Sequence, residues 1–311
     1  AVPAVKVGDH VDIGDVIATA GGFVSAPIHA SVSGTVKKID AILVSSGNNV
    51  NAITIESDGK MTVSDAVKPP KLETFEDFIN AVRDSGLVGL GGAGFPTAVK
   101  LKIDDLSRIK AVVINGAECE PYITCDTRIM IEYAREFVSG ARMLYRSLGL
   151  SRAYIGIEDN KTEAIAALNK YIGESGTDDI IVSVLPTKYP QGAEKQLVYG
   201  VTGRKIPIGA LPSAVGVVVA NVHTALSTYF AVADGVPLYK RIMTVTGGGI
   251  TNPKNLWVST GTLYSDVIEY CGGLKEGKSV VKMINGGPMM GTAVSGATIA
   301  CTKTTGCLLL M

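Results

Sequence analysis

The chain has 311 residues, of which 46% are hydrophobic and 19% charged, and its 29 basic side chains balance 29 acidic ones. This composition excludes a disordered chain, and the absence of a basic excess argues against nucleic acid as a partner. The length allows two or three domains with cores of their own. No apolar run approaches the ~18–20 residues of a membrane span, so we expect no direct membrane span.

Five scattered cysteines give neither a disulfide framework nor a zinc motif. Their odd number is typical of a reducing compartment, so we expect a cytoplasmic protein, or one held peripherally at the cytoplasmic face of a membrane. Cys301 and Cys307 lie close together in the sequence. A redox pair is one interpretation of them, but we favour buried cysteines that pack as small hydrophobic side chains.

Residues 1–68 alternate short apolar runs with glycine turns and show no helical period, which predicts a small all-β module. Its expected strands include the ranges Phe23–Ile28, Gly34–Ile39 and Asn51–Ile55. The segment Val67–Lys71 contains paired prolines and reads as a linker, because consecutive prolines keep the chain extended.

Residues 72–238 alternate strand-like and helix-like patterns. Thr74 and Asp77 form a capping box at the start of a first helix, and Gly86 is placed to end it. The expected strands are rich in Val and Ile, at Ala111–Asn115, Ala153–Ile157, Ile180–Leu185 and Val215–Ala220. Helices are expected at Thr127–Leu148 and at Lys161–Ile172, the latter capped by Asn160 with Glu163. Continuous apolar strands between helices predict an α/β fold with a mostly parallel, doubly covered sheet.

The pattern changes again at the end of the chain. Residues 239–290 run as strands, a short helix at Tyr264–Cys271 and a further strand at Val280–Ile284, which predicts a compact α+β module. Residues 291–311 end on an apolar run that reads as an unfinished strand. We therefore expect the chain to be a fragment whose last strand leads into a further domain.

The strongest functional signal is the glycine-rich segment Gly86–Thr97. Closely spaced glycines let backbone amides converge on an anion, and Lys100 just beyond can add positive charge. The segment matches neither GxGxxG after a strand nor GxxxxGK[ST]. Taken alone, it fits a tight packing loop equally well.

Three further polar segments strengthen the functional interpretation. They are Asn115–Pro121, Lys188–Glu194 and Asn221–Thr224, and each follows an expected strand. In an open parallel sheet, ligands bind beyond the carboxyl ends of the strands. We therefore expect these segments and the glycine-rich loop to converge on one site.

These four segments carry a resemblance to a known family. Gly89–Lys100, Asn115–Pro121, Tyr189–Glu194 and Asn221–Thr224 follow the order and approximate spacing of the flavin-binding subunit of respiratory complex I. The forms GLGGAGFPT and NGAECEP are more similar to the RnfC subunit of the Rnf electron-transport complex and to the electron-transfer protein associated with proline reductase. The resemblance covers essentially the whole chain, and the combination of the two motifs is unusual.

The resemblance implies a Rossmann-like domain that binds FMN and NAD(H). Gly89, Gly91, Gly92, Gly94 and Lys100 would form the flavin loop, and Asn115, Glu118, Tyr189, Gly192, Asn221 and Thr224 would surround FMN. Phe95 would stack on the NADH adenine, and Glu120 and Glu194 would lie near the nicotinamide nucleotide. No catalytic residue and no metal ligand is assigned, because hydride transfer belongs to the cofactor.

The chain departs from the complex I motifs at four positions. Leu90 replaces an arginine, Ala117 and Ala193 replace acids, and Ala220 replaces an asparagine. Several of these differences are features of the Rnf-type branch. The family's 4Fe-4S cysteines would follow residue 311, so clusters are expected only in a C-terminal region absent from this chain.

The two flanking modules also resemble known folds. Residues 1–68 are similar to a biotinyl/lipoyl-type barrel-sandwich hybrid, but the hairpin tip Ala20–Phe23 has no lysine to modify, so neither biotin nor lipoate is expected. Residues 239–290 resemble a β-grasp soluble-ligand-binding domain, in which we expect Trp257 and Tyr264 to serve in packing.

The resemblance implies a flavin-linked electron-transfer subunit that moves electrons between NADH and iron–sulfur carriers. Its partners would be the other electron-transfer subunits of a membrane Rnf complex, or proline reductase if it acts as a soluble feeder. The alternative is a non-catalytic nucleotide-binding or docking adaptor of a redox complex, since the four departures remove polar groups from the expected site.

Overall fold

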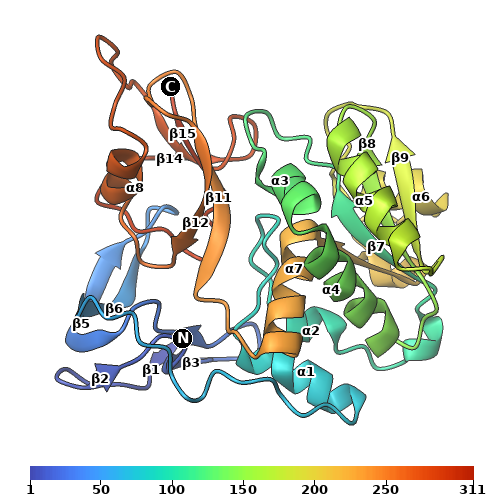
Figure 1. The fold of residues 1–311 in the computed structure, drawn as a ribbon, viewed down its shortest axis with the longest axis horizontal. Helices are drawn as coiled ribbons and strands as arrows, with labels where there is room; N and C mark the ends of the chain where they lie inside the picture. The colour runs from blue at the N-terminus through green and yellow to red at the C-terminus, as the bar shows by residue number, and fades with distance from the viewer.

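Four β-sheets organise the chain in the computed structural model, which describes residues 1–311 (Figure 1). Two three-stranded sheets form from the N-terminal residues, a four-stranded parallel sheet lies at the centre of the sequence, and a five-stranded mixed sheet ends it. The expected α/β fold class with two β-rich flanking modules is confirmed.

The N-terminal module consists of short antiparallel strands in two sheets, ordered β1-β3-β4 and β2-β5-β6. These strands are β1 (Val2–Pro3), β2 (His10–Val11), β3 (Val16–Thr19), β4 (Ile28–His29), β5 (Gly34–Leu43) and β6 (Asn49–Ser57). A small apolar core includes Val11 and Val36. The strand expected at Phe23–Ile28 begins only at Ile28. The amide of Gly21 donates to Ser25 Oγ at 3.1 Å, which closes a local turn before this strand and leaves Phe23 exposed.

The central sheet is parallel throughout and has the strand order β10-β7-β8-β9. Its strands are β7 (Ala111–Gly116), β8 (Ala153–Glu158), β9 (Ile180–Leu185) and β10 (Val217–Asn221). Successive residues of β7 enter different cores: Val112 and Ile114 face one apolar cluster, whereas Val113 faces another. Because successive side chains of a strand point to opposite faces, this alternation shows that both faces of the sheet are covered, as the apolar runs predict.

Helices cover both faces of the parallel sheet (Figure 1). They are α1 (Phe75–Asp84), α2 (Thr97–Leu101), α3 (Cys125–Glu132), α4 (Ala134–Ser147), α5 (Thr162–Glu174), α6 (Glu194–Thr202) and α7 (Val222–Tyr229). Short 3₁₀ turns at Leu106–Arg108 and Pro212–Val215, and a π-helical turn at Phe230–Asp234, complete the domain. None of the helices combines the length and the apolar character that a membrane crossing requires.

The expected helix ends are confirmed at α1, whereas the helix expected at Thr127–Leu148 and the cap expected at Asn160 differ from the structure. Thr74 and Asp77 form the capping box, and Gly86 has a φ of 70°, a left-handed conformation that suits glycine just past a helix. The helix expected at Thr127–Leu148 is instead two helices, because Tyr133 leaves helical geometry with φ −120° and ψ 30°. For α5 the N-cap is Lys161, which makes no side-chain cap, so the expected cap at Asn160 stands one residue too early.

A partly buried ion pair joins α4 to the residue before β9. Asp179 accepts from Arg142 Nε at 2.9 Å and from the Tyr145 hydroxyl at 2.6 Å. Burial alone would raise the pKa of Asp179, but the hydrogen bonds from Arg142, Tyr145 and Thr177 outweigh it and hold that pKa well below its usual range. The ionised carboxylate therefore stabilises the folded state.

We expect Asp179→Asn to lower the free energy of unfolding by about 2 kcal/mol at neutral pH, because Arg142 would lose its partly buried, hydrogen-bonded counter-ion. A carboxylate with a depressed pKa stabilises at pH values above its unfolded pKa of about 4 and loses that contribution as the pH falls further. Urea unfolding at several pH values tests this: the difference between wild type and variant should be constant above about pH 5 and shrink below pH 4. A difference independent of pH would contradict it.

The C-terminal sheet has the strand order β12-β11-β15-β13-β14 and packs against the short helix α8 (Tyr264–Tyr270). Its strands are β11 (Lys240–Thr246), β12 (Lys254–Ser259), β13 (Met283–Asn285), β14 (Thr292–Val294) and β15 (Cys307–Leu310). The strand expected at Val280–Ile284 starts later, at Met283, where pairing with β15 begins. Strand β15 is central, parallel to β11 and antiparallel to β13, which explains why Leu308–Leu310 are fully buried. The expected last strand thus completes this sheet.

Polar contacts join the three parts of the chain. Lys303, in the loop before β15, donates from Nζ to Pro27 O at 2.7 Å and to Gly86 O at 2.6 Å. Trp257 on β12 donates from Nε1 to the Tyr133 hydroxyl at 2.8 Å between α3 and α4. These contacts fix the C-terminal sheet beside the helices of the central domain (Figure 1).

Candidate functional site

The site lies where the order of the central sheet reverses. Strands β7, β8 and β9 follow one another across the sheet, whereas β10 returns to the other side of β7. Asn115, the next-to-last residue of β7, and Asn221, the last residue of β10, are therefore direct neighbours in register. In open α/β sheets this switch point, beyond the carboxyl ends of the strands, is where ligands bind.

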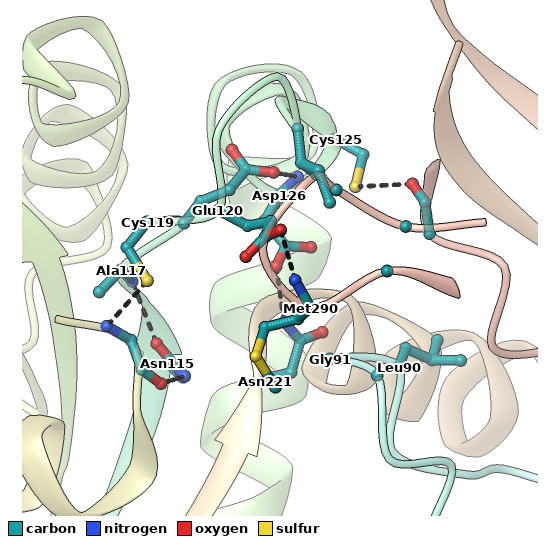
Figure 2. A pocket seen from close by; sticks show the side chains of 18 of the residues that line it. Leu90, Gly91, Asn115, Ala117, Cys119, Glu120, Cys125, Asp126, Asn221 and Met290 are labelled. Carbon is teal, nitrogen blue, oxygen red and sulfur yellow. Dashed lines mark hydrogen bonds between the residues drawn. The ribbon is translucent and has the colours of Figure 1, made fainter. Parts of the chain in front are cut away.

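A cavity of about 460 Å³ opens at this point (Figure 2). Its walls come from the glycine-rich loop, the segments after β7, β9 and β10, and the C-terminal sheet. The expected site residues that line it are Gly91, Gly92, Asn115, Glu118, Glu120, Tyr189, Gly192 and Asn221. Its volume falls in the range of pockets for small ligands and cofactors.

The glycine-rich loop is folded back on itself at the mouth of the cavity. Gly89 N donates to Phe95 O at 2.8 Å, and Leu90 N donates to Thr224 Oγ1 at 2.9 Å, which ties the loop to α7. Gly92 has a φ of 129°, and a Cβ added there would meet no atom within 4 Å. The amides of Gly91, Gly92 and Ala93 donate to no acceptor in the chain. Free successive amides at an open loop suit an anion.

Asn115 holds the segment after β9 against β7. Its Nδ2 donates to Gly192 O at 2.8 Å, and its Oδ1 accepts from Ala117 N at 3.2 Å. Gly192 approaches so closely that an added Cβ would lie 2.3 Å from Ala117 O, while its amide donates to Cys119 Sγ at 3.3 Å. Only glycine permits this approach, which shapes one wall of the cavity (Figure 2).

Asn221 serves as the N-cap of α7. Its Oδ1 accepts from the amides of His223 and Thr224 at 2.9 and 3.3 Å, and its Nδ2 donates to Asp126 Oδ2 at 2.6 Å. An asparagine at this position satisfies the otherwise free amides of a helix start. Asn221 therefore links β10, α7 and α3 at the floor of the cavity.

Glu118 also caps a helix. Its carboxylate accepts from the amides of Asp126 and Thr127 at 2.8 and 3.1 Å and from the Thr127 hydroxyl at 2.6 Å. Burial, followed by the nearby charge of Glu118, raises the pKa of Asp126 to about 7. Carboxylate oxygens of Glu118 and Asp126 and the Cys125 sulfur lie within 4.8 Å of one another. Glu118 and Asp126 thus line the cavity as two neighbouring acids.

Six expected site residues lie outside the lining of the cavity. Gly89 and Thr224 shape the glycine-rich loop from behind, Gly94 turns it with a φ of 65°, and Phe95 is 40% exposed at its outer side. Lys100 Nζ lies 3.4 Å from Glu194 Oε1 and donates to Val219 O at 3.0 Å. Lys100 and Glu194 therefore pair with each other behind the end of β10.

Sequence reasoning missed the contribution of the C-terminal sheet. Arg241 on β11 is 2% exposed and lines the cavity, and its guanidinium donates to Lys303 O at 2.8 Å and Leu90 O at 3.4 Å. The turn between β13 and β14 and residues Thr304 and Gly306 also line it. The available signal was an arginine beside the apolar strand residues Ile242 and Met243, since arginine is rarely buried without a reason.

A histidine and two cysteines also lie in the elements that surround the site. His223 is fully buried and its Nε2 accepts from Ile242 N at 3.4 Å, which joins α7 to β11. Burial lowers the pKa of His223 well below its usual value, so the imidazole is neutral. Cys301 and Cys307 are buried, as expected, and burial raises the pKa of each thiol to about 12.

Three family models match this chain. Residues 82–229 match the Nuo51 FMN-binding domain, residues 1–60 the RnfC barrel sandwich hybrid domain, and residues 242–293 the SLBB domain. The chain is 46% identical over 294 residues to the RnfC subunit of the Na(+)-translocating ferredoxin:NAD(+) oxidoreductase complex of Acetobacterium woodii, covering 93% of this chain and 65% of that protein. The chain belongs to the RnfC family.

Further RnfC proteins are almost as similar. Identity is 43% to the RnfC subunit of the proton-translocating ferredoxin:NAD(+) oxidoreductase complex of Clostridium ljungdahlii, covering 97% of this chain and 65% of that protein. It is 40% to the RnfC subunit of the ion-translocating oxidoreductase complex of Rhodobacter capsulatus, covering 100% of this chain and 60% of that protein. The chain thus spans less than two thirds of the length of these RnfC relatives.

The fold is also found in a solved structure. An NAD+-reducing [NiFe]-hydrogenase in the H2-reduced state superposes with a TM-score of 0.64 at 19% identity, over 77% of this chain and 47% of the hydrogenase chain. At this identity the likeness is one of fold.

Proposed function

We propose that this RnfC chain binds FMN in the cavity at the β7–β10 switch point and moves electrons between NADH and iron–sulfur carriers. The observation that carries the proposal is the set of free amides at Gly91, Gly92 and Ala93, because Gly91 and Gly92 line the cavity together with Asn115 and Asn221. The match of residues 82–229 to the Nuo51 FMN-binding domain supports the choice of cofactor. Bound FMN would accept a hydride from NADH and pass its electrons on singly, or act in reverse.

The residues of the cavity fit such a cofactor. The free amides of the glycine-rich loop suit its phosphate, and Arg241 adds a buried positive charge beside Leu90. Asn115, Asn221 and Glu118 hold the surrounding segments through hydrogen bonds and helix caps, so these side chains keep the walls in place. Glycines at 91 and 192 keep the walls close: an added Cβ would lie 3.2 Å from Asn221 Cβ and 2.3 Å from Ala117 O, respectively.

The NADH side of the site is proposed at the outer edge of the same cavity. Glu120 and Tyr189 line it there, and Phe95 offers an exposed ring on which an adenine can stack. Loss of solvent contact and the nearby charge of Glu120 raise the pKa of Tyr189, so its hydroxyl keeps the proton it can donate to a ligand. We propose that Glu194, which pairs with Lys100, lies near the nucleotide farther along this edge.

The iron–sulfur carriers are proposed to lie outside residues 1–311. A 4Fe–4S cluster takes four cysteine thiolates, whereas the five cysteines here are free thiols, of which Cys119 alone is not buried. The RnfC relatives are subunits of ferredoxin:NAD(+) oxidoreductase complexes, which favours the other electron-transfer subunits of an Rnf-type complex as partners over proline reductase. We propose a position at the cytoplasmic face of the membrane, where NADH is available.

The competing function is an adaptor that binds a nucleotide, or nothing, without redox chemistry. Leu90, Ala117 and Ala193 line the cavity with apolar side chains at three of the four positions where the complex I motifs are polar. The free loop amides and Arg241 favour FMN, because an adaptor without an anionic ligand would leave them unused.

Anaerobic titration of the purified chain with FMN separates these functions. We expect saturable quenching of flavin fluorescence, followed by bleaching of the flavin's visible band when NADH is added. Gly92→Val should weaken FMN binding by about tenfold or more, because a branched side chain is strained at a φ of 129° and would fill the space that the phosphate needs.

The matched control is Gly8→Val in the N-terminal module. Gly8 also has a left-handed φ, 96°, and an added Cβ there meets nothing within 4 Å, but it does not line the cavity. This variant should bind FMN as the wild type does. Saturable FMN binding without bleaching by NADH, or no binding at all, would favour the adaptor.

A further inference from the structure

The turn between β13 and β14 lies over the cavity opposite Glu120. Gly286, Gly287, Met290 and Gly291 of this turn line the cavity that the central domain forms. Figure 2 shows the backbone nitrogen of Met290 directed toward the Glu120 carboxylate and its side chain extending away from that carboxylate, with Asn115 and Asn221 lower in the view. The C-terminal sheet therefore supplies part of the wall on the side proposed for the nucleotide.

Two backbone amides of this turn hold one oxygen of Glu120. Met289 N donates to Glu120 Oε1 at 2.8 Å and Met290 N donates to the same atom at 3.0 Å. Both donors converge on Oε1, which leaves Oε2 without a backbone donor. Because an ionised carboxylate can accept several hydrogen bonds, Oε2 remains able to accept from a ligand hydroxyl.

The glycines of the turn allow this close approach. A Cβ added at Gly287 would lie 2.3 Å from Glu120 Cγ and 2.4 Å from Oε1. Gly286 has a φ of 103°, and a Cβ at Gly291 would lie 2.3 Å from Gly287 O, so the turn needs glycine at each end.

The base of the turn is anchored on both sides. Asn285, at the end of β13, pairs with Leu308 of the central strand β15 and with Thr292 of β14. Its Nδ2 donates to Ser45 Oγ at 2.9 Å, between β5 and β6 of the N-terminal module. The turn is thus a supported element that can fix the direction of a flexible glutamate side chain.

We propose that the β13–β14 turn positions Glu120 for the nicotinamide nucleotide, holding Oε1 so that Oε2 can accept from a ribose hydroxyl. This inference rests on the proposed function and assigns the C-terminal sheet a role in nucleotide affinity. A turn that instead competed with the nucleotide for Glu120 would have the opposite effect on affinity, because its removal would free the carboxylate.

Gly287→Ala tests the proposal with a small change. The three atoms nearest to the added methyl group all belong to the Glu120 side chain, so the methyl group displaces that side chain. Calorimetric titration of the oxidised, FMN-loaded chain with NAD+ should show binding weakened by about tenfold or more, since a hydrogen bond to a charged group is lost. The affinity for FMN should be unchanged. Gly296→Ala, in open space after β14, is the matched control and should leave both affinities unchanged.

A double-mutant cycle shows whether the effect acts through Glu120. Glu120→Gln should itself weaken NAD+ binding, and adding Gly287→Ala should then cause no further loss. Hydrogen exchange gives a readout without any cofactor: the amides of Met289 and Met290 should exchange faster in Glu120→Ala than in the wild type.

Several outcomes would overturn the positioning role. Unchanged or tighter NAD+ binding by Gly287→Ala, or a loss that simply adds to that of Glu120→Gln, would do so. Each of these requires a wild type that binds FMN and NAD+. A wild type that binds neither would instead contradict the proposed function itself.

Discussion

Replacing Arg241 with methionine is expected to weaken FMN binding by about a hundredfold while the chain keeps its fold. The guanidinium is buried at the cavity and donates to the carbonyls of Leu90 and Lys303. Burial lowers the pKa of Arg241, and the nearby charge of Asp126 opposes this without forming a direct ion pair. The buried cation is therefore only partly compensated in the free protein. A bound phosphate would serve as its counter-ion through charge-assisted hydrogen bonds, each worth about 1.5–3 kcal/mol.

The stability of this variant separates a binding role from a structural one. Methionine is similar in length and apolar, and replacing a buried charge with an apolar side chain is often neutral or stabilising. Thermal unfolding of the FMN-free variant should therefore occur near the wild-type temperature. Arg204→Met is the matched control, because Arg204 also donates to a carbonyl, Val215 O at 2.6 Å, but lies away from the cavity.

An Arg241→Met chain that binds FMN as tightly as the wild type would contradict the prediction. The charge would then serve only to join Leu90 to the loop before β15. A variant that loses FMN binding and also unfolds at much lower temperature would show the same structural role. Only loss of affinity with an intact fold supports Arg241 as a cofactor-binding residue.

Local chemistry made part of the fold predictable. The capping box at Thr74 and the left-handed Gly86 act within one helical turn, and both were found where the sequence placed them. The parallel sheet followed from strands such as Val112–Ile114, which are apolar at every position because both faces are covered. The break at Tyr133 was missed because no glycine or proline marks it, and the contact of the Tyr133 hydroxyl with the distant Trp257 cannot be seen in the local sequence.

The candidate site, like the fold, could be predicted from the sequence only in part. Asn115 and Asn221 were expected to meet because each follows a strand of the parallel sheet, and they are neighbours in register. Arg241 and the β13–β14 turn escaped notice because they belong to another sheet, and only its packing against the central domain brings them to the cavity. Lys100 was expected at the glycine-rich loop from proximity in sequence, yet its ammonium group points to Val219 O and Glu194.

Gly140→Ala is expected to lower the free energy of unfolding by about 3 kcal/mol or more. Gly140 lies in α4 where this helix crosses α7, and the two run side by side in Figure 1. An added Cβ would lie 1.9 Å from Ala225 O and 3.2 Å from Tyr229 N. Both are backbone atoms of α7, so no side chain can move aside and the helices must separate.

The same change should also weaken FMN binding, because α7 begins at the cavity. Its N-cap Asn221 and its first-turn residue Thr224 hold Asp126 and the glycine-rich loop, respectively. A helix displaced at Ala225, one residue farther along, would carry both contacts with it. A structural glycine that does not line the cavity would therefore contribute to its shape.

Gly173→Ala in α5 is the matched control, since it also adds a methyl group within a helix but meets nothing within 4 Å. There we expect a gain of up to about 1 kcal/mol, because alanine favours the helix and restricts the unfolded chain. Urea unfolding of both variants, followed by FMN titration, would measure effects of opposite sign for the same chemical change. Equal stabilities of Gly140→Ala and the wild type would mean that α4 and α7 can move apart at little cost, and the glycine would then not be what sets the position of α7 beneath the cavity.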